Sequence, residues 1–344
     1  MTGLERIRAL LSGGVPDAVP VFPIIHSGLA PLFGVPLGKF FTDPDAMAEV
    51  IVRGYRDFGW DGVQLSLGVT AEAEAFGARV EQPENAPPAL KQHVLAGEDF
   101  SGLLRSLDCA GLAGKGRFPL FSEAVRRVVR EIGSEAFVLV TLRGPLLMAA
   151  QLRGAERVLL DTIDFPEQLD ALLDFTVRAA HALGRSLLDA GAHGVMLGEA
   201  ACSPSFISPA AYRRFVFAKH VQLVHDLKAA GWNAIGLHVC GGIIPILEDL
   251  VSTGADIIDV DYQVPADEAL KINRGRAVLR GNLDPSTVFA FGTPASAGDA
   301  AAELASRVSR GSRWIFSSGC DLSPGTPAEN IRCAVTALRS SLTP

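Results

Sequence analysis

Short apolar segments alternate with longer amphipathic patterns along most of this chain, and this alternation limits its fold more than any other feature. Eight segments have the character of buried strands, at residues 19–25, 62–67, 137–142, 194–197, 234–239, 256–260, 277–281 and 314–318. Helical periodicity between such segments is typical of parallel β/α construction. We therefore predict an α/β fold, a (β/α)8 barrel of the TIM type. An open doubly wound sheet is the alternative, although no glycine-rich phosphate motif follows the first strand.

Prolines and capping residues mark the starts of the predicted helices. Residues 44–58 carry apolar side chains at helical spacing, with Thr42 or Asp43 as the cap and a proline in the first turn. The other predicted helices cover residues 166–190, 209–230, 244–253, 294–310 and 327–342. Because TIM-type barrels commonly have the length of this chain, we expect a single domain over residues 1–344.

The composition argues against several classes of function. The 31 Lys and Arg against 38 Asp and Glu give a formal charge of -7, which argues against nucleic acid or another polyanion as partner. No apolar run approaches the ~18 residues of a membrane span, and the N-terminus lacks the apolar core of a signal peptide. We therefore expect a cytoplasmic protein. Its five widely spaced cysteines are typical of reduced thiols, which more often bind metal or do chemistry than form disulfides.

Reactive side chains gather where the predicted strands end. In a TIM-type barrel the active site forms at this edge, from the loops that follow the strands. The residues concerned are His26, Arg143, Glu199, His238, Cys240, Asp261, Asn282, Asp284 and Cys320. Because they follow different strands, the barrel predicts that they share one mouth.

The motif from Gly236 to Gly242, Gly-Leu-His-Val-Cys-Gly-Gly, carries the most specific chemistry. Side chains alternate along a strand, so His238 and Cys240 point to the same face. An imidazole and a thiolate suit tetrahedral Zn²⁺, and we expect Cys320, 80 residues downstream, to be the third ligand. Three protein ligands with an open fourth position are typical of a catalytic zinc site. Two thiolates favour activation of a thiol substrate over activation of water.

The structural alternative is a His-x-Cys pair that belongs to the core, as most such pairs do. Its place at a strand end, together with a cysteine after the last strand, favours the metal site. We expect the other cysteines and histidines to be packing or surface residues, namely Cys109, Cys202, Cys333, His93, His181, His193, His220 and His225.

Motifs along nearly the whole chain carry a family resemblance. They are Arg6-Ile-Arg-Ala-Leu-Leu-Ser-Gly, Val19-Pro-Val-Phe-Pro, Glu72-Ala-Glu-Ala-Phe-Gly-Ala, Arg143-Gly-Pro, Gly236-Leu-His-Val-Cys-Gly, Gly281-Asn-Leu-Asp-Pro and Gly319-Cys-Asp-Leu-Ser-Pro-Gly-Thr-Pro-Ala-Glu-Asn. With these motifs the chain resembles the uroporphyrinogen decarboxylase superfamily. Within it, the chain is similar to the zinc-dependent methylcobamide:coenzyme M methyltransferases and their corrinoid-linked relatives. The fold that this resemblance implies is again a TIM-type barrel.

The resemblance implies an enzyme that moves a methyl group between a methylated corrinoid and a thiol such as coenzyme M, or a folate acceptor. His238, Cys240 and Cys320 are its implied zinc ligands, and a zinc-bound thiolate is the implied nucleophile. The corrinoid would arrive as free methylcobamide or on a corrinoid protein, because no fused corrinoid-binding segment is evident. The direction of transfer stays open, and a homodimer is implied only by analogy.

Six residues are candidates for substrate binding, namely His26, Glu74, Arg143, Glu199, Asp261 and Asn282. Asp261 could also fill the open metal position or, like Glu199, support the metal site through hydrogen bonds. Arg143 could hold an anionic tail such as a sulfonate. Glu74 would line the mouth if residues 72–74 were extended. Each candidate has a structural alternative as a helix cap, a turn brace or a solvated surface residue.

Two other classes of function stay open. A decarboxylase-like lyase would act on a carboxylated small molecule, but porphyrinogen enzymes have an arginine-rich motif after the first strand, whereas residues 23–30 contain no arginine. A substrate with many carboxylates needs arginine forks. A non-catalytic zinc-binding or corrinoid-binding module would bind its ligand without methyl transfer.

Overall fold

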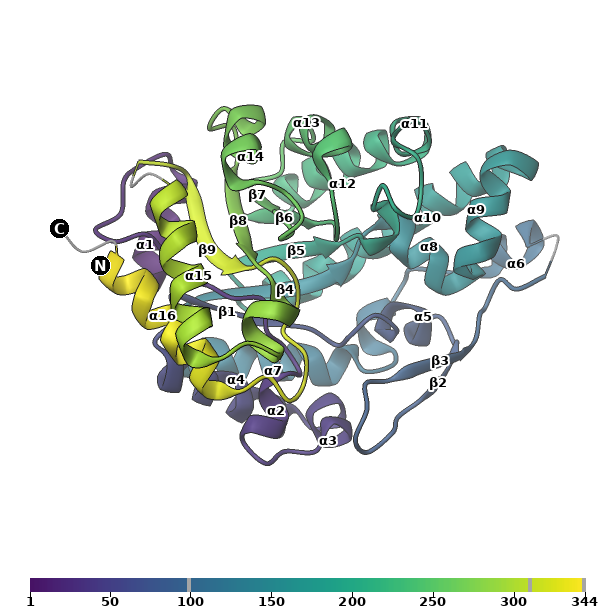
Figure 1. Cartoon of the computed structure of the whole chain (residues 1–344). Helices are drawn as coiled ribbons and strands as arrows, with labels where there is room; N and C mark the ends of the chain where they lie inside the picture. The colour runs from purple at the N-terminus through teal and green to yellow at the C-terminus, as the bar shows by residue number, and fades with distance from the viewer. Residues whose placement is uncertain (98–99, 309–310, 342–344) are drawn as a thin grey trace.

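A parallel sheet of seven strands forms the centre of the computed structural model, which describes residues 1–97, 100–308 and 311–341. In sheet order the strands are β1 (Gly62–Leu65), β4 (Phe137–Arg143), β5 (Gly194–Gly198), β6 (Ile235–His238), β7 (Ile257–Asp259), β8 (Val278–Leu283) and β9 (Trp314–Ser318). Each corresponds to a predicted strand, with ends that differ by a few residues. Figure 1 shows the sheet curled at the centre of the molecule with helices outside it.

The first predicted strand, at residues 19–25, is wrong as a regular strand. Within this segment a β-bridge forms at Val21, which pairs with Phe316 of β9. The backbone N–H of Phe22 donates to the Phe316 carbonyl (2.8 Å), and the N–H of Asp61 donates to the Val21 carbonyl (2.9 Å). Prolines on both sides of the bridge have no N–H, so a ladder cannot continue there. The bridge still joins β9 to the start of β1, and the sheet has the TIM-type arrangement that was predicted.

Helices cover the outside of the sheet. They are α1 (Gly3–Leu11), α2 (Leu29–Leu32), α3 (Leu37–Thr42), α4 (Pro44–Phe58), α5 (Ala71–Ala75), α6 (Ser101–Ser106), α7 (Phe118–Ile132), α8 (Pro145–Arg153), α9 (Ala155–Asp164), α10 (Pro166–Asp189), α11 (Pro209–Ala211), α12 (Phe217–Ala229), α13 (Ile244–Ser252), α14 (Ala266–Asn273), α15 (Pro294–Arg307) and α16 (Ala328–Ser341). None of the helices in the described ranges is long and apolar enough to cross a membrane.

The helix boundaries follow the capping chemistry of the sequence. The Asp43 side chain accepts from the backbone N–H groups of Asp45 and Ala46, so Asp43 and not Thr42 caps α4. The helix predicted at residues 209–230 is divided, because a π-helical turn (Tyr212–Val216) separates α11 from α12. Residues 310 and 342, where two predicted helices end, lie outside the described residues.

None of the elements between β1 and β4 was predicted individually, neither the helices α5, α6 and α7 nor a two-stranded hairpin. An antiparallel hairpin of β2 (Arg79–Glu81) and β3 (Ala89–Gln92) lies outside the sheet, at the lower right of Figure 1. Its strands are partly exposed and carry charged residues, so they lack the apolar run of a core strand. The segment that contains Glu72 and Glu74 is the helix α5 and not an extended segment, so these two side chains do not share one face.

Candidate active site

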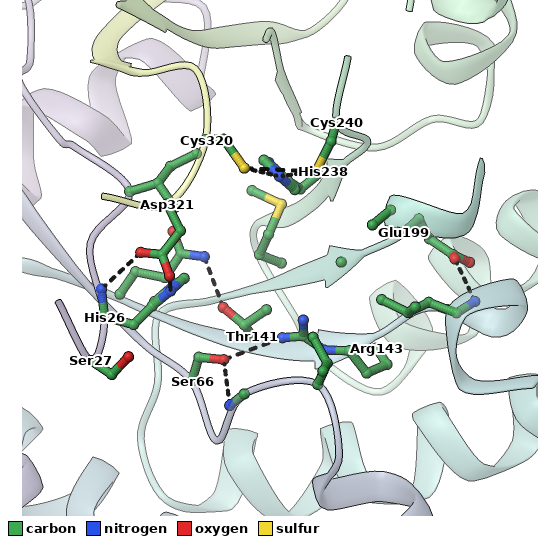
Figure 2. A pocket seen from close by; sticks show the side chains of 18 of the residues that line it. His26, Ser27, Ser66, Thr141, Arg143, Glu199, His238, Cys240, Cys320 and Asp321 are labelled. Atoms are coloured by element: carbon green, nitrogen blue, oxygen red, sulfur yellow. Dashed lines mark hydrogen bonds and ion pairs between the residues drawn. The ribbon is translucent and has the colours of Figure 1, made fainter. Parts of the chain in front are cut away.

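A cavity of about 210 Å³ opens at the carboxyl ends of the strands. Most of the residues that line it lie in or directly after β1, β4, β5, β6 and β9, or follow the Val21 bridge, and Phe41 of α3 and Leu147 of α8 also border it. Its polar lining includes His26, Ser66, Thr141, Arg143, Glu199, His238, Cys240, Cys320 and Asp321 (Figure 2). This is the edge at which TIM-type barrels carry their active sites.

Two sulfurs and one imidazole nitrogen meet on the wall of this cavity. Cys240 Sγ lies 3.3 Å from His238 Nε2 and 3.7 Å from Cys320 Sγ. Cys320 Sγ lies 3.6 Å from His238 Nε2. Figure 2 shows the three side chains pointing toward one another from the end of β6 and from the segment after β9. The structure therefore brings Cys320 together with His238 and Cys240, which lie 82 and 80 positions earlier in the sequence.

The donor set fits a tetrahedral Zn²⁺ ion. With Zn–S near 2.3 Å and Zn–N near 2.0 Å, tetrahedral ligand atoms lie about 3.8 Å apart for two sulfurs and about 3.5 Å apart for sulfur and nitrogen. The observed separations of 3.7 Å between the sulfurs and 3.3 and 3.6 Å between sulfur and nitrogen are close to these values. The three residues also border the cavity, where a fourth, exchangeable ligand has room.

Two glycines allow the sulfurs to approach. Gly241 has a φ of 86°, a left-handed conformation that glycine adopts without strain, and it turns the chain directly after Cys240. Gly319 packs against the backbone of Tyr262, where an added Cβ would lie 2.4 Å from the Tyr262 nitrogen. A side chain at position 319 would therefore push Cys320 away from its partners.

Hydrogen bonds among His238, Cys240 and Cys320 shift the pKa values of all three groups. Burial alone would lower the pKa of His238, but its hydrogen bonds with Asp259 and Cys320 raise it to about 10. The hydrogen bond between the sulfurs lowers the pKa of Cys240, and the same bond, together with burial, raises the pKa of Cys320. Because metals bind thiolates and neutral imidazoles, a divalent cation at this cluster would release protons.

A buried carboxylate behind the cluster fixes the orientation of His238. Asp259 Oδ2 lies 2.9 Å from His238 Nδ1, so Nε2 is the nitrogen that faces the sulfurs. Arg280 donates to both oxygens of Asp259, at 2.7 and 2.6 Å. Sequence reasoning missed Asp259 and Arg280. The available signal was a charged residue inside each of two otherwise apolar strands, because such a residue faces a partner in the barrel interior.

Arg143 ends β4 with its guanidinium beside the cavity. The strand register aligns Arg143 with Gly198 of β5, and Gly198 with His238 of β6. Because Gly198 has no side chain, the guanidinium can lie over β5, where an added Cβ would be 3.1 Å from Arg143 Nη1. The Arg143 backbone N–H donates to Glu72 at 2.8 Å. Burial lowers the pKa of Arg143, while Glu72 opposes this shift.

Glu199 lines the cavity and also belongs to a second cluster, which is fully buried. Glu199 Oε1 lies 2.9 Å from His220 Nε2, and the Tyr212 hydroxyl lies 3.1 Å from His220 Nδ1. The two Glu199 oxygens accept two backbone N–H groups in the first turn of α8, at 3.0 and 2.8 Å. This carboxylate therefore caps a helix from outside it. Cys202 lies in the same cluster, so His220 and Cys202 are packing residues, as their sequence context indicates.

His26 lines the cavity, whereas Glu74 does not. His26 Nδ1 pairs with Asp321 at 3.1 Å, and its Nε2 is buried without a hydrogen-bond partner in the described part of the chain. Glu74 forms an ion pair with Arg117 at 2.6 Å. The helical geometry of α5 turns Glu74 away from the mouth.

Asp261 and Asn282 brace the turn after β7 and do not line the cavity. β7 ends at Asp259, so Asp261 already lies in the turn, where its side chain accepts the backbone N–H of Gln263 at 3.0 Å. Asn282 donates to the carbonyls of Asp261 and Val264, at 3.2 and 2.6 Å. The Asp284 side chain caps the π-helical turn that follows it.

Comparison with known proteins identifies the family. The uroporphyrinogen decarboxylase (URO-D) model matches residues 2–341. Methylcobamide:CoM methyltransferase MtaA of Methanosarcina barkeri is 27% identical over 338 residues, which cover 96% of each protein. The methylated-thiol–coenzyme M methyltransferase of Methanosarcina mazei is 25% identical over 348 residues, covering 100% of this chain and 91% of that protein.

A solved structure of a methyltransferase from Methanosarcina mazei has the same fold. It superposes with a TM-score of 0.90 at 24% identity and covers 99% of both chains. Similarity to the two sequence relatives over nearly the whole length indicates an enzyme of the methyltransferase type. With a family model that matches from residue 2 to residue 341, the chain belongs to the uroporphyrinogen decarboxylase family.

Proposed function

We propose that the protein transfers a methyl group from a methylated corrinoid to a small thiol, with zinc held by His238, Cys240 and Cys320. The observation that carries the proposal is the meeting of three donor atoms, 3.3 to 3.7 Å apart, on the cavity wall. Relatives over nearly the whole chain are named for methyl transfer from methylcobamide or a methylated thiol to coenzyme M. Coenzyme M is therefore the first acceptor to test.

The zinc ligands, Asp259 and His26 have separate parts in the proposed reaction. Bound zinc would hold the acceptor thiol as a thiolate at neutral pH. The thiolate sulfur attacks the methyl carbon in line, the carbon–cobalt bond breaks, and its electron pair leaves with the cobalt of the corrinoid substrate as cobalt(I). Asp259 holds His238 through Nδ1. His26 Nε2, a buried acceptor on the cavity wall, takes the proton that the thiol loses.

The size of the cavity suggests where the two substrates bind, the thiol inside the cavity and the corrinoid at its mouth. Its volume of about 210 Å³ is below the ~300–1,000 Å³ of pockets for drug-sized ligands, so it suits a small thiol better than a folate. A corrinoid, free or on a corrinoid protein, would present its methyl group from the mouth. Among the described residues that line the cavity, Arg143 is the one arginine, which disfavours a decarboxylase for polycarboxylates.

A reducing compartment suits this site. The sulfurs of Cys240 and Cys320 lie 3.7 Å apart, and an oxidising compartment would favour a disulfide between them. A disulfide would remove both thiolates from the metal. We therefore propose a cytoplasmic enzyme.

Metal analysis and a methyl-transfer assay test the proposed function. Protein purified without chelators should hold about one zinc per chain, and methylcobalamin mixed with coenzyme M should yield cobalt(I), measured by its absorbance. Cys320→Ser should lose both properties. The matched control Cys333→Ser, in α16, should keep both. Full activity of zinc-free protein, or intact methylcobalamin after incubation of zinc-loaded protein with coenzyme M, contradicts the proposal.

A further inference from the structure

An ion pair lies inside the barrel, directly behind His238. Asp259 of β7 and Arg280 of β8 are register partners, and their side chains are 1% and 0% exposed. The interior of a TIM-type barrel is usually filled by branched apolar side chains. A buried ion pair adds little stability in such a place, because both charges must leave water. Stability alone therefore does not explain why the pair is there.

The guanidinium of Arg280 is held by three groups. Its Nε and Nη2 donate to the two oxygens of Asp259, at 2.7 and 2.6 Å. Its Nη1 donates to Gln64 Oε1 at 2.8 Å, from β8 to β1, which is not a neighbour of β8 in the sheet. The ring of Phe22 covers the guanidinium, with 4.9 Å between the ring centre and the guanidinium carbon. Because arginine cannot lose its proton in a protein, a positive charge is fixed at this point of the interior.

Asp259 faces the arginine on one side and His238 on the other. A carboxylate that accepts two bonds from a guanidinium stays ionised. Its Oδ2 also lies 2.9 Å from His238 Nδ1. The negative charge of Asp259 is therefore on the side of the imidazole that faces away from the two sulfurs.

The orientation of His238 does not by itself require an arginine. A backbone carbonyl could also accept from Nδ1 and fix the ring, without adding a charge. A carboxylate in this position adds a negative charge, which disfavours a second anion in a buried site. Arg280 offsets that charge, because its guanidinium lies against both oxygens of Asp259.

The charges of the metal site show why this offset matters. A divalent zinc ion with two thiolates and a neutral imidazole has no net charge, so a thiolate as the fourth ligand turns the centre into an anion. Two other charged side chains act on Cys240, namely Asp261 and Arg143, and they have opposite signs. Without Arg280, the anionic centre would therefore face the uncompensated charge of Asp259 across one imidazole ring.

We infer that Arg280 is a positioning residue that determines ligand specificity: it holds Asp259 against His238 and offsets its charge, so that the metal takes an anionic sulfur as its fourth ligand. The inference rests on the proposed function for the metal and for the thiolate. Loss of the positive charge at Arg280 disfavours an anionic ligand. Loss of the negative charge at Asp259 favours it. A merely structural role of the pair would weaken ligand binding in both cases.

Thiol binding to cobalt-loaded protein tests these opposite signs. Mercaptoethanol, whose tail is neutral, is titrated at saturating Co²⁺, and sulfur-to-cobalt charge-transfer absorbance measures the bound thiolate. Arg280→Met should bind the thiol about tenfold more weakly than wild type, and Asp259→Asn about tenfold more tightly. The double variant should be close to wild type. Binding that is not weaker in Arg280→Met, or not tighter in Asp259→Asn, overturns the inference. If Arg280→Met does not fold, Asp259→Asn and the double variant still decide.

A neutral ligand and a matched variant control for structural effects. Imidazole binds the open metal position without charge, so its affinity should be the same in wild type, Arg280→Met and Asp259→Asn. Arg153→Met removes the arginine of another buried ion pair, which Arg153 forms with Asp161 at 2.9 Å outside the cavity. It should bind both ligands as wild type does. An equal loss of imidazole and mercaptoethanol affinity in Arg280→Met would show a merely structural role and overturn the inference.

The titration also separates this inference from the proposed function. Cobalt-loaded wild type that gives no charge-transfer absorbance with mercaptoethanol would refute the metal-bound thiolate of the proposed function. Thiolate binding that is equal in wild type and Arg280→Met would leave that function intact and refute the role of Arg280. Opposite shifts in the two variants, without methyl transfer from methylcobalamin by the zinc-loaded wild type, would support the role of Arg280 and refute the proposed reaction.

Discussion

Two clusters in this molecule contain the same kinds of metal-binding side chain, and they differ in how their lone pairs are used. The open cluster is His238, Cys240 and Cys320, and the closed cluster is Glu199, Cys202 and His220; in each, the ligand atoms lie within 4.8 Å of one another. The open cluster borders the cavity, and its sulfurs contact one another and the imidazole. The closed cluster is fully buried, and its carboxylate and imidazole are bonded to the first turn of α8, to each other and to Tyr212.

This comparison shows that metal-binding side chains can lie close together without forming a site that is open to a metal ion. An ion in the closed cluster would have to replace hydrogen bonds that cap α8. Burial also raises the pKa of Cys202 well above its ordinary value, so its sulfur stays a thiol, whereas metals bind thiolates. The open cluster has donor atoms that no backbone group uses. The proposed metal site is therefore the open cluster, whereas the hydrogen bonds of the closed cluster connect α8 and α12.

The largest expected effect is a difference in bound zinc between two variants that carry the same His→Gln substitution, one in each cluster. His238→Gln should lose essentially all bound zinc, because an amide replaces the imidazole ligand. His220→Gln should keep zinc at the wild-type level, because His220 is buried against Glu199 and Tyr212 and is not one of the three proposed ligands. Zinc per chain is measured by mass spectrometry after dialysis. Zinc loss in both variants, with both folded by circular dichroism, would remove the distinction between the clusters.

Thiol reactivity should differ strongly between the clusters. In chelator-treated protein, iodoacetamide should label Cys240 and Cys320, which border the cavity. Cys202 should stay unlabelled even at about pH 9, because burial raises its pKa and keeps the thiol protonated there. Peptide mapping measures the labelling of each residue. Added zinc should slow the labelling of the first two cysteines, and labelling of Cys202 at a similar rate would contradict the closed arrangement.

A smaller effect on zinc affinity is expected when Asp259, the carboxylate behind the open cluster, is replaced. Asp259→Asn weakens the acceptor that orients His238, and the loss of such a partner typically lowers metal affinity by about 10- to 100-fold. Asp256→Asn, just before β7, is the control and should bind zinc as wild type does. Competition with a fluorescent chelator measures the affinity. Unchanged affinity in Asp259→Asn would show that the open cluster does not depend on its buried support.

The smallest expected effect is a loss of folding stability when the closed cluster loses one hydrogen bond. Tyr212→Phe removes the hydroxyl that lies 3.1 Å from His220 Nδ1 and leaves a buried nitrogen unpaired. The free energy of unfolding should fall by about 1–2 kcal/mol, measured by urea denaturation. Zinc content should not change. A variant that loses zinc without losing stability would reverse the roles assigned to the two clusters.

The barrel is predictable because its signals are local. Each strand from β1 to β9 in the central sheet is an apolar segment, and Asp43 with Pro44 marks the start of α4. The segment at residues 19–25 is apolar too, but its prolines remove N–H donors and limit the pairing to a bridge. The apolar character of residues 19–25 therefore predicted correctly that this segment lies beside the sheet. It overstated the number of backbone hydrogen bonds that the segment forms.

The candidate site is predictable to the extent that it follows from strand geometry. Alternation places His238 and Cys240 on one face, and the barrel brings position 320 to the same mouth. The hydrogen-bond partners of the site residues cannot be predicted from strand geometry alone. Whether Asp259 or Asp261 contacts His238 depends on where β7 ends, and Glu199 is tied to the closed cluster by atoms on α8 and α12. No spacing in the sequence specifies such pairings.

The place of Cys320 in the chain has a consequence for how the protein matures. β6 and β9 are separated in the sheet by β7 and β8. A growing polypeptide that has reached β6 holds two of the three donor atoms but cannot yet enclose an ion. If the site holds zinc as proposed, the ion would be enclosed only after β9 and the segment that carries Cys320 have joined the sheet.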